Sequence, residues 1–265
     1  MCGIVGIIDK NAANLVSVMN STIHHRGPDS SGIYTDPSNN LALGMTRLAI
    51  LDIAGGCQPI HSPDGRYVLV FNGEIYNSPE LRSSLIQSGI QFASSNSDTE
   101  VLLHLLVRYG KECIPLLNGM FAFIFYDSLE KKLLSARDRF GIKPLYYAVS
   151  CDGLAISSEL KSMMKVPWIS RDISMPSLSH FLSLHYVPGV QTIYTSVQRL
   201  APGHLLEYSR DSFKISQWHN LTHDHSFRGS RADAVEALRA SVSSAVSRWS
   251  LSDVPIGCSL SGGLD

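Results

Sequence analysis

The second residue of the chain, Cys2, carries the sharpest chemical signal in the sequence. A small residue at position 2 permits removal of Met1, which would leave Cys2 with a thiol and a free α-amine. The ordinary pKa of an α-amine is about 7.7–8.0, so the amine can serve as general base for the thiol without a histidine partner. Taken alone, however, the position is better explained by a cysteine that packs at the end of a strand.

Three other positions have side chains that suit the binding or cleavage of a small polar substrate. Asn72-Gly73 is the strongest hairpin-turn dipeptide, so taken alone it predicts a turn between two strands. Arg47 stands close to Met45 and Leu48 in an apolar run, which disfavours a simple solvated residue. Asp98 falls in the first turn of a predicted helix, where the helix dipole stabilises an acid without any ligand.

A phosphate site is predicted near residue 265. The predicted strand Val254–Leu260 runs into the glycine-rich sequence Ser261–Asp265, and this order opens many phosphate sites in α/β domains. Among the histidines, only His223-Asp224-His225 has ligand-like spacing. Because it lies in a polar stretch without a nearby cysteine, we expect no metal site there.

The elements that must position these residues are predicted mainly within residues 1–160. Apolar, β-rich runs predict strands at Gly3–Ile8, Leu41–Thr46, Tyr67–Phe71, Phe121–Tyr126, Lys132–Ala136, Pro144–Val149 and Leu154–Ser158. Several of these runs are apolar on both faces, so covering layers are needed. Helices are predicted at Asn14–Thr22, after an N-cap at Ser78, and after the capping box Ser97–Glu100. Together they indicate an α+β sandwich of stacked layers.

The pattern changes after residue 208. Residues 209–230 are polar and read as a linker. A second capping box, Ser230 with Asp233, opens a helix whose apolar stripe runs from Val235 to Trp249. The predicted organisation is a first domain at 1–208, the linker at 209–230, and the first helix and strand of an α/β domain at 231–265.

Seven motifs in one chain order resemble the class II glutamine amidotransferases, most closely the glutamine-hydrolysing asparagine synthetases. They are Cys2–Gly6, His25–Asp29, Arg47–Ile50, Phe71–Asn77, Ser97–Glu100, Gly119–Phe123 and Arg137–Gly141. The resemblance covers essentially the whole chain. It implies a four-layer αββα sandwich of the N-terminal-nucleophile hydrolase type, joined to the start of an ATP-dependent synthetase domain.

The resemblance also implies a role for each site residue. It makes Cys2 the nucleophile and gives Asn72 and Gly73 the oxyanion hole, so a turn and an oxyanion hole both remain open for this pair. It assigns glutamine binding to Arg47, Leu48, Ala49, Ile50, Leu51, Asn72, Gly73, Glu74 and Asp98. It assigns ATP binding to Leu260, Ser261, Gly262, Gly263 and Asp265, with Asp265 as a magnesium ligand in the full enzyme.

The implied reaction is hydrolysis of L-glutamine to L-glutamate and ammonia through a Cys2 thioester. In the full-length family enzyme the ammonia serves the ATP-dependent conversion of L-aspartate to L-asparagine. The glutaminase reaction needs no cofactor, whereas the missing synthetase part would need ATP and Mg²⁺. Two alternatives stay open: a related synthetase that acts on another carboxylic acid, and a non-catalytic binding module. A homodimer is also open.

Composition excludes several other classes. With 44% apolar and 17% charged residues the chain can bury a sizeable core, which excludes a disordered protein. Its net charge of −1 gives no electrostatic footprint for nucleic acid or an anionic membrane. No apolar run approaches the roughly 18 residues of a membrane span, and no basic segment marks a secretory signal. The five scattered cysteines fit a reducing, cytoplasmic compartment.

Overall fold

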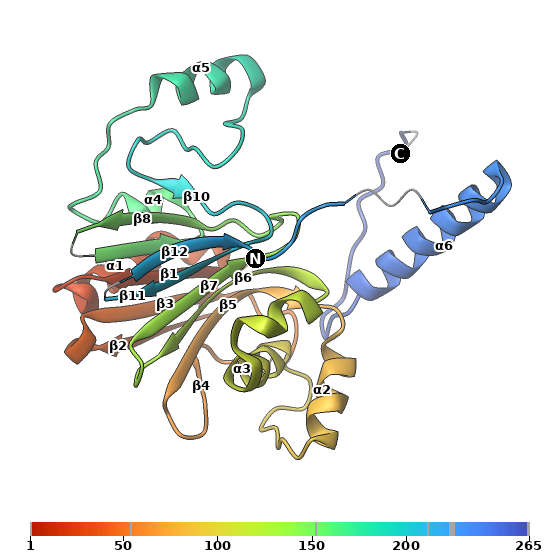
Figure 1. Ribbon diagram of the computed structural model, residues 1–265, viewed down its shortest axis with the longest axis horizontal. Helices are drawn as coiled ribbons and strands as arrows, with labels where there is room; N and C mark the ends of the chain where they lie inside the picture. The colour runs from red at the N-terminus through yellow and green to blue at the C-terminus, as the bar shows by residue number, and fades with distance from the viewer. Residues whose placement is uncertain (1, 54, 152, 211, 223–225, 264–265) are drawn as a thin grey trace.

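The computed structural model describes residues 2–53, 55–151, 153–210, 212–222 and 226–263. Two six-stranded antiparallel sheets lie face to face at its centre (Figure 1). The first sheet has the order β10 (Gln198–Arg199), β8 (Tyr146–Ser150), β9 (Gly153–Ser157), β1 (Gly3–Ile8), β3 (Leu41–Arg47), β2 (Ser30–Asp36). The second has the order β12 (Ser212–Gln217), β11 (His204–Ser209), β7 (Lys132–Arg137), β6 (Gly119–Asp127), β5 (Tyr67–Ile75), β4 (Ile60–His61).

Helices cover the outer face of each sheet. Helices α1 (Ala12–Thr22) and α4 (Leu160–Met163) pack on the first sheet, and α2 (Ser78–Gln87) and α3 (Asp98–Tyr109) lie on the side of the second. The predicted four-layer αββα sandwich is therefore confirmed. Three short 3₁₀ segments lie at His24–Arg26, Pro37–Asn39 and Gly110–Leu116.

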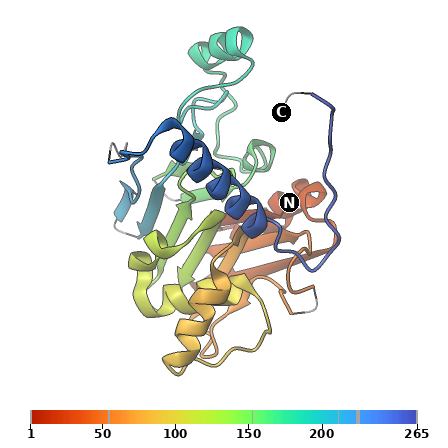
Figure 2. The same ribbon diagram turned by 90° about the vertical axis from the view of Figure 1, so that its right-hand side faces the viewer.

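Two further helices lie outside the layers. Helix α5 (Met175–Leu184) extends away from the sheets at the top of the view, and α6 (Arg231–Trp249) projects at the right (Figure 1). In the perpendicular view α6 crosses in front of the sheets, and the chain after it turns upward on the right-hand side toward the C-terminus (Figure 2). Helix α6 begins at the predicted capping box of Ser230 and Asp233. Its apolar stripe is exposed, with Leu238 at 65% and Val246 at 56%.

The alternation of side chains in the central strands explains the three apolar layers of the core. In β5, Leu69 and Phe71 pack against the helices, whereas Val68 and Val70 face the first sheet. The outer face of the first sheet packs with α1 and α4 in a third cluster. Each central strand is thus buried on both faces, as its two-faced apolar sequence predicts.

All seven strands predicted within residues 1–160 are present, with shifts at their ends. Five strands were not predicted from the sequence: β2, β4, β10, β11 and β12. Strands β4 and β10 have two residues each, β2 and β12 carry polar and exposed side chains, and β11 has only two buried residues. Strand β12 lies inside the predicted linker 209–230 and pairs with β11, so the second sheet continues past residue 208.

In contrast, the eighth predicted strand, Val254–Leu260, is absent. These residues are largely exposed, and among the described residues no strand pairs with them. A strand forms only with a partner for its backbone groups, so the apolar run alone does not suffice. At α2, Asn77 rather than Ser78 occupies the cap position. In the described part of the chain, no helix is long and apolar enough to cross a membrane.

Candidate active site

Cys2 lies at the start of β1, in the middle of the first sheet. The pairing of Gly3 with Thr46 places Cys2 beside the end of β3. The Arg26 Nε donates to the Cys2 carbonyl oxygen at 2.9 Å, and the Leu48 backbone N–H donates to the Cys2 Sγ at 3.4 Å. Burial raises the pKa of the Cys2 thiol, against the lowering effect of its hydrogen bond with the Leu48 backbone. A thiol in this environment needs a base before it can attack.

A cavity of about 320 Å³ opens beside Cys2 and collects most of the predicted site residues. Of the nucleophile, oxyanion and glutamine-binding residues expected from sequence, it is lined by Cys2, Arg47, Leu48, Ile50, Leu51, Asn72, Gly73, Glu74 and Asp98. Ala49 does not line it, and its backbone N–H donates to the Asp29 carboxylate at 2.9 Å. The volume suits a small-molecule ligand.

Asn72 and Gly73 lie within β5, so the hairpin-turn interpretation of this pair is wrong. Alternation along β5 puts Asn72 on the same face as Val68 and Val70, toward the sheet that carries Cys2. Asn72 is 0% exposed, and neither polar atom of its amide has a hydrogen-bond partner among the described residues. Such a buried, unpaired amide is costly unless a ligand completes its bonds.

Gly73 is required by the close approach of the neighbouring strand. It pairs with Phe121 of β6, and a Cβ atom at position 73 would stand 2.3 Å from the Met120 carbonyl oxygen. Any larger residue would push the strands apart at the point where Asn72 faces the cavity. The absence of a side chain here leaves the backbone open to the cavity.

Arg47 ends β3, and a loop folds around its guanidinium. Its Nη2 donates to the carbonyl oxygens of Leu51 at 3.0 Å and Asp52 at 2.6 Å, and its Nη1 donates to that of Ile53 at 3.1 Å. A Cβ at Gly56 would stand 2.3 Å from Nη2, so this residue must also be small. Two of the five guanidinium donors have no partner among the described residues and remain for a ligand.

Asp98 enters the cavity from the N-terminus of α3. Its carboxylate accepts the Ile75 backbone N–H at 3.0 Å, and burial raises its pKa to about 6. Glu74 adds to that rise, and burial raises the pKa of Glu74 as well. The predicted capping box is half correct: Ser97 caps the Glu100 N–H, but the Glu100 carboxylate binds the Ala93 and Ser94 backbone instead.

Four cavity residues carry no signal that the sequence analysis used. They are Gly56, Gln58, Ile142 and Lys143. Trp249 also lines the cavity, although its sequence signal was only the apolar stripe of a helix. Lys143 is 5% exposed, and burial lowers its pKa while the nearby Glu74 opposes that effect. Its backbone N–H donates to the buried Asp138 carboxylate at 3.0 Å, and its carbonyl oxygen accepts from Arg137 at 2.7 Å. Its position two residues after the Arg137–Gly141 motif was the available clue.

The predicted ATP-binding residues do not belong to this cavity. Leu260 is 88% exposed, and Ser261, Gly262 and Gly263 are exposed as well. Asp265 and the His223–His225 cluster lie outside the described residues. Within the described part of the chain, no group of three or more histidine, cysteine, aspartate or glutamate side chains is placed to hold a metal ion.

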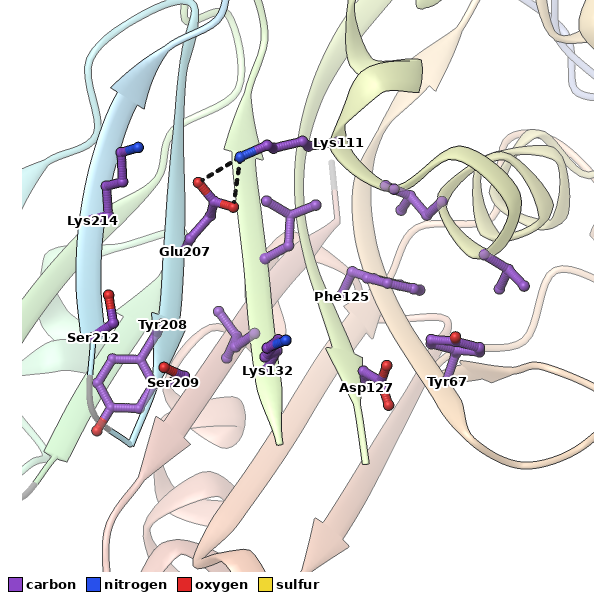
Figure 3. A pocket seen from close by; sticks show the side chains of 15 residues that line it. Tyr67, Lys111, Phe125, Asp127, Lys132, Glu207, Tyr208, Ser209, Ser212 and Lys214 are labelled. Carbon is purple, nitrogen blue, oxygen red and sulfur yellow. Dashed lines mark hydrogen bonds and ion pairs between the residues drawn. The ribbon is translucent and has the colours of Figure 1, made fainter. Parts of the chain in front are cut away.

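A larger hollow, of about 600 Å³, lies on the outer face of the second sheet (Figure 3). An ion pair between Lys111 Nζ and Glu207 Oε1, at 3.0 Å, crosses it from the end of α3 to β11. None of the predicted site residues lines this hollow. Volume alone therefore does not locate the site.

Residues 1–219 match a family model described as a glutamine amidotransferase domain. Over 272 residues the chain is 36% identical to asparagine synthetase [glutamine-hydrolyzing] 1 of Bacillus subtilis, covering all of this chain and 42% of that protein. Over 271 residues it is 35% identical to asparagine synthetase [glutamine-hydrolyzing] 2 of Oryza sativa subsp. japonica, covering 40% of that protein. The chain thus spans about two fifths of the length of these relatives.

Among solved structures, the glutamine phosphoribosylpyrophosphate amidotransferase of B. subtilis matches with a TM-score of 0.60 and 22% identity. The match covers 82% of this chain and 49% of that one. At this identity the likeness concerns the fold alone. It confirms the N-terminal-nucleophile hydrolase sandwich expected from the sequence.

Proposed function

This chain belongs to the glutamine amidotransferase domain family, and from that premise we propose that it hydrolyses L-glutamine through a thioester on Cys2. The observation that carries the proposal is the amide of Asn72, which is fully buried, has no hydrogen-bond partner among the described residues and belongs to the cavity that Cys2 lines. An amide donor without a protein partner is suited to the oxyanion that forms when a thiolate attacks an amide carbon.

The rest of the cavity complements the other groups of free glutamine. The two remaining guanidinium donors of Arg47 suit the α-carboxylate. Asp98 and Glu74 offer acidic partners for the α-ammonium group. Ionising the buried Asp98 beside the half-buried Glu74 is unfavourable, as the raised pKa of each shows, and a bound ammonium would offset that cost.

In the first half of the reaction the Cys2 Sγ attacks the side-chain amide carbon, and the thiol proton passes to the α-amine of Cys2. The carbonyl oxygen becomes an oxyanion held by the Asn72 side chain and the Gly73 N–H. Collapse breaks the C–N bond, and the ammonia leaves with the proton returned by the amine. Water then attacks the thioester, with the amine as base, which releases L-glutamate and restores the thiol.

We further propose that, in a full-length protein like the relatives, the ammonia serves the ATP-dependent conversion of L-aspartate to L-asparagine. Residues Leu260 to Gly263 are the segment that would meet ATP. In this structure they are exposed and have neither a paired strand before them nor a helix around them, so they do not form a nucleotide site. No step of the glutaminase reaction depends on ATP or Mg²⁺.

The direct test is Cys2→Ala, which should abolish glutamate release and labelling by a glutamine-like electrophile while the fold stays intact. Cys258→Ala removes an exposed cysteine and is the matched control, which should keep full activity. Intact-mass measurement should show that active chains lack Met1. Appreciable glutaminase activity of Cys2→Ala, or of chains that retain Met1, would refute the proposed nucleophile.

A further inference from the structure

The segment that follows α6 makes a specific contact with two loops of the glutamine cavity. The Asp253 Oδ2 accepts the backbone N–H of Asp52 at 2.7 Å, and the Asp253 backbone N–H donates to the Ile50 carbonyl oxygen at 3.0 Å. The same carboxylate accepts from the Asn96 Nδ2 at 3.0 and 3.2 Å. One side chain thus joins a loop after β3 to the loop before α3. Figure 2 shows the chain after α6 turning upward on the right-hand side of the view.

Each of these loops delivers a charged residue to the cavity. The carbonyl oxygen of Asp52 is one of the three that hold the Arg47 guanidinium. Asn96 precedes the cap residue Ser97, which fixes the start of α3 and therefore the position of Asp98. Asp253 is therefore bonded to the backbone that orients Arg47, the proposed partner of the carboxylate. It is also bonded to the loop that leads to Asp98, the proposed partner of the ammonium group.

The loop around Arg47 needs such external support. Asp52 has a positive φ of 48°, a conformation that costs a non-glycine residue about 1 kcal/mol or more. Its own side chain accepts the Gly55 N–H at 3.1 Å through Oδ1, whereas its backbone N–H is bonded to Asp253. The Asp253 carboxylate is the acceptor, and the bond is charge-assisted.

We propose that Asp253 is a positioning residue for glutamine: it ties the two substrate-binding loops together, so that affinity depends on docking of the segment after α6. This inference rests on the proposed glutaminase function. Trp249 lines the same cavity, which places both ends of the Trp249–Asp253 segment at the glutamine site. Asp253 does not reach the reacting atoms and acts through Arg47 and Asp98.

The experiment measures glutamine binding by calorimetry in a Cys2→Ala chain, with and without Asp253→Ala, and kinetics in the chain that keeps Cys2. We expect Asp253→Ala to raise the Kd and the KM for glutamine about tenfold, the size of one charge-assisted hydrogen bond, while kcat changes less than twofold. Asp253→Asn should restore most of the affinity, because an amide oxygen still accepts the Asp52 N–H. Glu236→Ala removes an exposed carboxylate from α6 and should change nothing.

The outcomes separate this inference from the function on which it rests. If the Cys2→Ala chain is folded but does not bind glutamine, the proposed function is refuted and this inference with it. If it binds glutamine with the same Kd before and after Asp253→Ala, only the positioning role is refuted. Should Asp253→Ala not fold, Asp253→Asn compared with Glu236→Ala decides, since a lower affinity for the asparagine variant than for the control is still expected.

Discussion

Two polar side chains of the cavity carry hydrogen-bonding groups that the described residues leave without a partner. Among the described residues the Asn72 amide has no partner, and Arg47 has two donors without one beside its three bonds to its own loop. Groups of this kind reduce the stability of the folded chain and gain their bonds only from a ligand. Sites of catalysis are where such unpaired groups are expected.

We predict that Asn72→Ala lowers kcat for glutamine roughly 10²–10³-fold, the usual effect of losing one oxyanion donor, with a small change in KM. Because the amide makes no bond to the described residues, the urea midpoint should stay close to that of the unaltered chain. Asn14→Ala, which removes an exposed amide on α1, is the control. A kcat within fivefold of the unaltered value would remove Asn72 from the oxyanion hole.

Asp98 should give the reaction a pH dependence of its own. Burial raises its pKa to about 6, so the carboxylate is lost below that pH and the α-ammonium of glutamine loses a partner. We predict that kcat/KM, which reports groups of the free enzyme, falls more steeply below about pH 6. The steeper fall should disappear in Asp98→Asn, whose kcat/KM is lower throughout. An unchanged profile would contradict the assignment.

The raised pKa of Asp98 also determines how this residue changes the stability of the folded chain with pH. A pKa raised in the folded state means that the folded chain binds the proton more tightly than the unfolded chain. The stabilising contribution is therefore complete below the ordinary pKa of an aspartate and is lost as the pH rises through about 6. Asp98→Asn should accordingly be no less stable than the unaltered chain at pH 7.

At the scale of elements, the two-faced apolar strands were predictable and the edge strands were not. In Phe121–Tyr126 every side chain is buried, so composition alone signals a central strand. Strand β12 carries exposed Ser212, Phe213 and Lys214, a sequence that also suits a loop, and only its pairing with β11 makes it a strand. Local sequence contains no information on that pairing.

The site residues likewise divide into those that the sequence identifies and those that only the fold brings to the cavity. Asp98 could be found from its motif and its place at a helix start. Lys143 could not be placed, because only the folding of its loop around Asp138 brings it to the cavity. Asp253 lies 201 residues from Asp52, and no local pattern links residues that far apart.

Substitution of Trp218 tests whether the first domain continues past the predicted boundary at 208. Its ring stacks on Phe121 at 6.0 Å between centroids, and its Nε1 donates to the Arg137 carbonyl oxygen at 3.2 Å. We predict that Trp218→Ala lowers the free energy of unfolding by about 2–3 kcal/mol, since the ring is only partly buried. Trp249→Ala, at a residue 61% exposed, should cost less than about 0.5 kcal/mol. Equal costs in urea unfolding would place Trp218 outside the core.

At the scale of the whole molecule, the cavity beside Cys2 lies mostly within the layered sandwich, whereas Ser261–Gly263 lie exposed outside that cavity. Backbone N–H groups can hold a pyrophosphate only when a strand and a helix fix the loop that bears them. Ser261 to Gly263 have neither in this structure.

We therefore predict that this chain, incubated with ATP, Mg²⁺, L-aspartate and L-glutamine, releases glutamate but no pyrophosphate and no asparagine. Omitting ATP should leave the rate of glutamate release unchanged. Stoichiometric release of pyrophosphate by the purified chain would show that a competent nucleotide site forms, against the exposed arrangement of these residues.

The placement of Asn72 within β5 limits how this protein can diverge in evolution. Successive side chains in a strand point to opposite faces, so one residue inserted between Val68 and Asn72 would turn the amide toward the helices. Insertion or deletion of an odd number of residues in β5 before Asn72 would therefore remove the amide from the cavity, whereas exposed turns between strands can lengthen without changing the face to which it points. Related sequences can therefore differ in the length of their loops, whereas along the strand that carries the amide they are expected to differ by substitution.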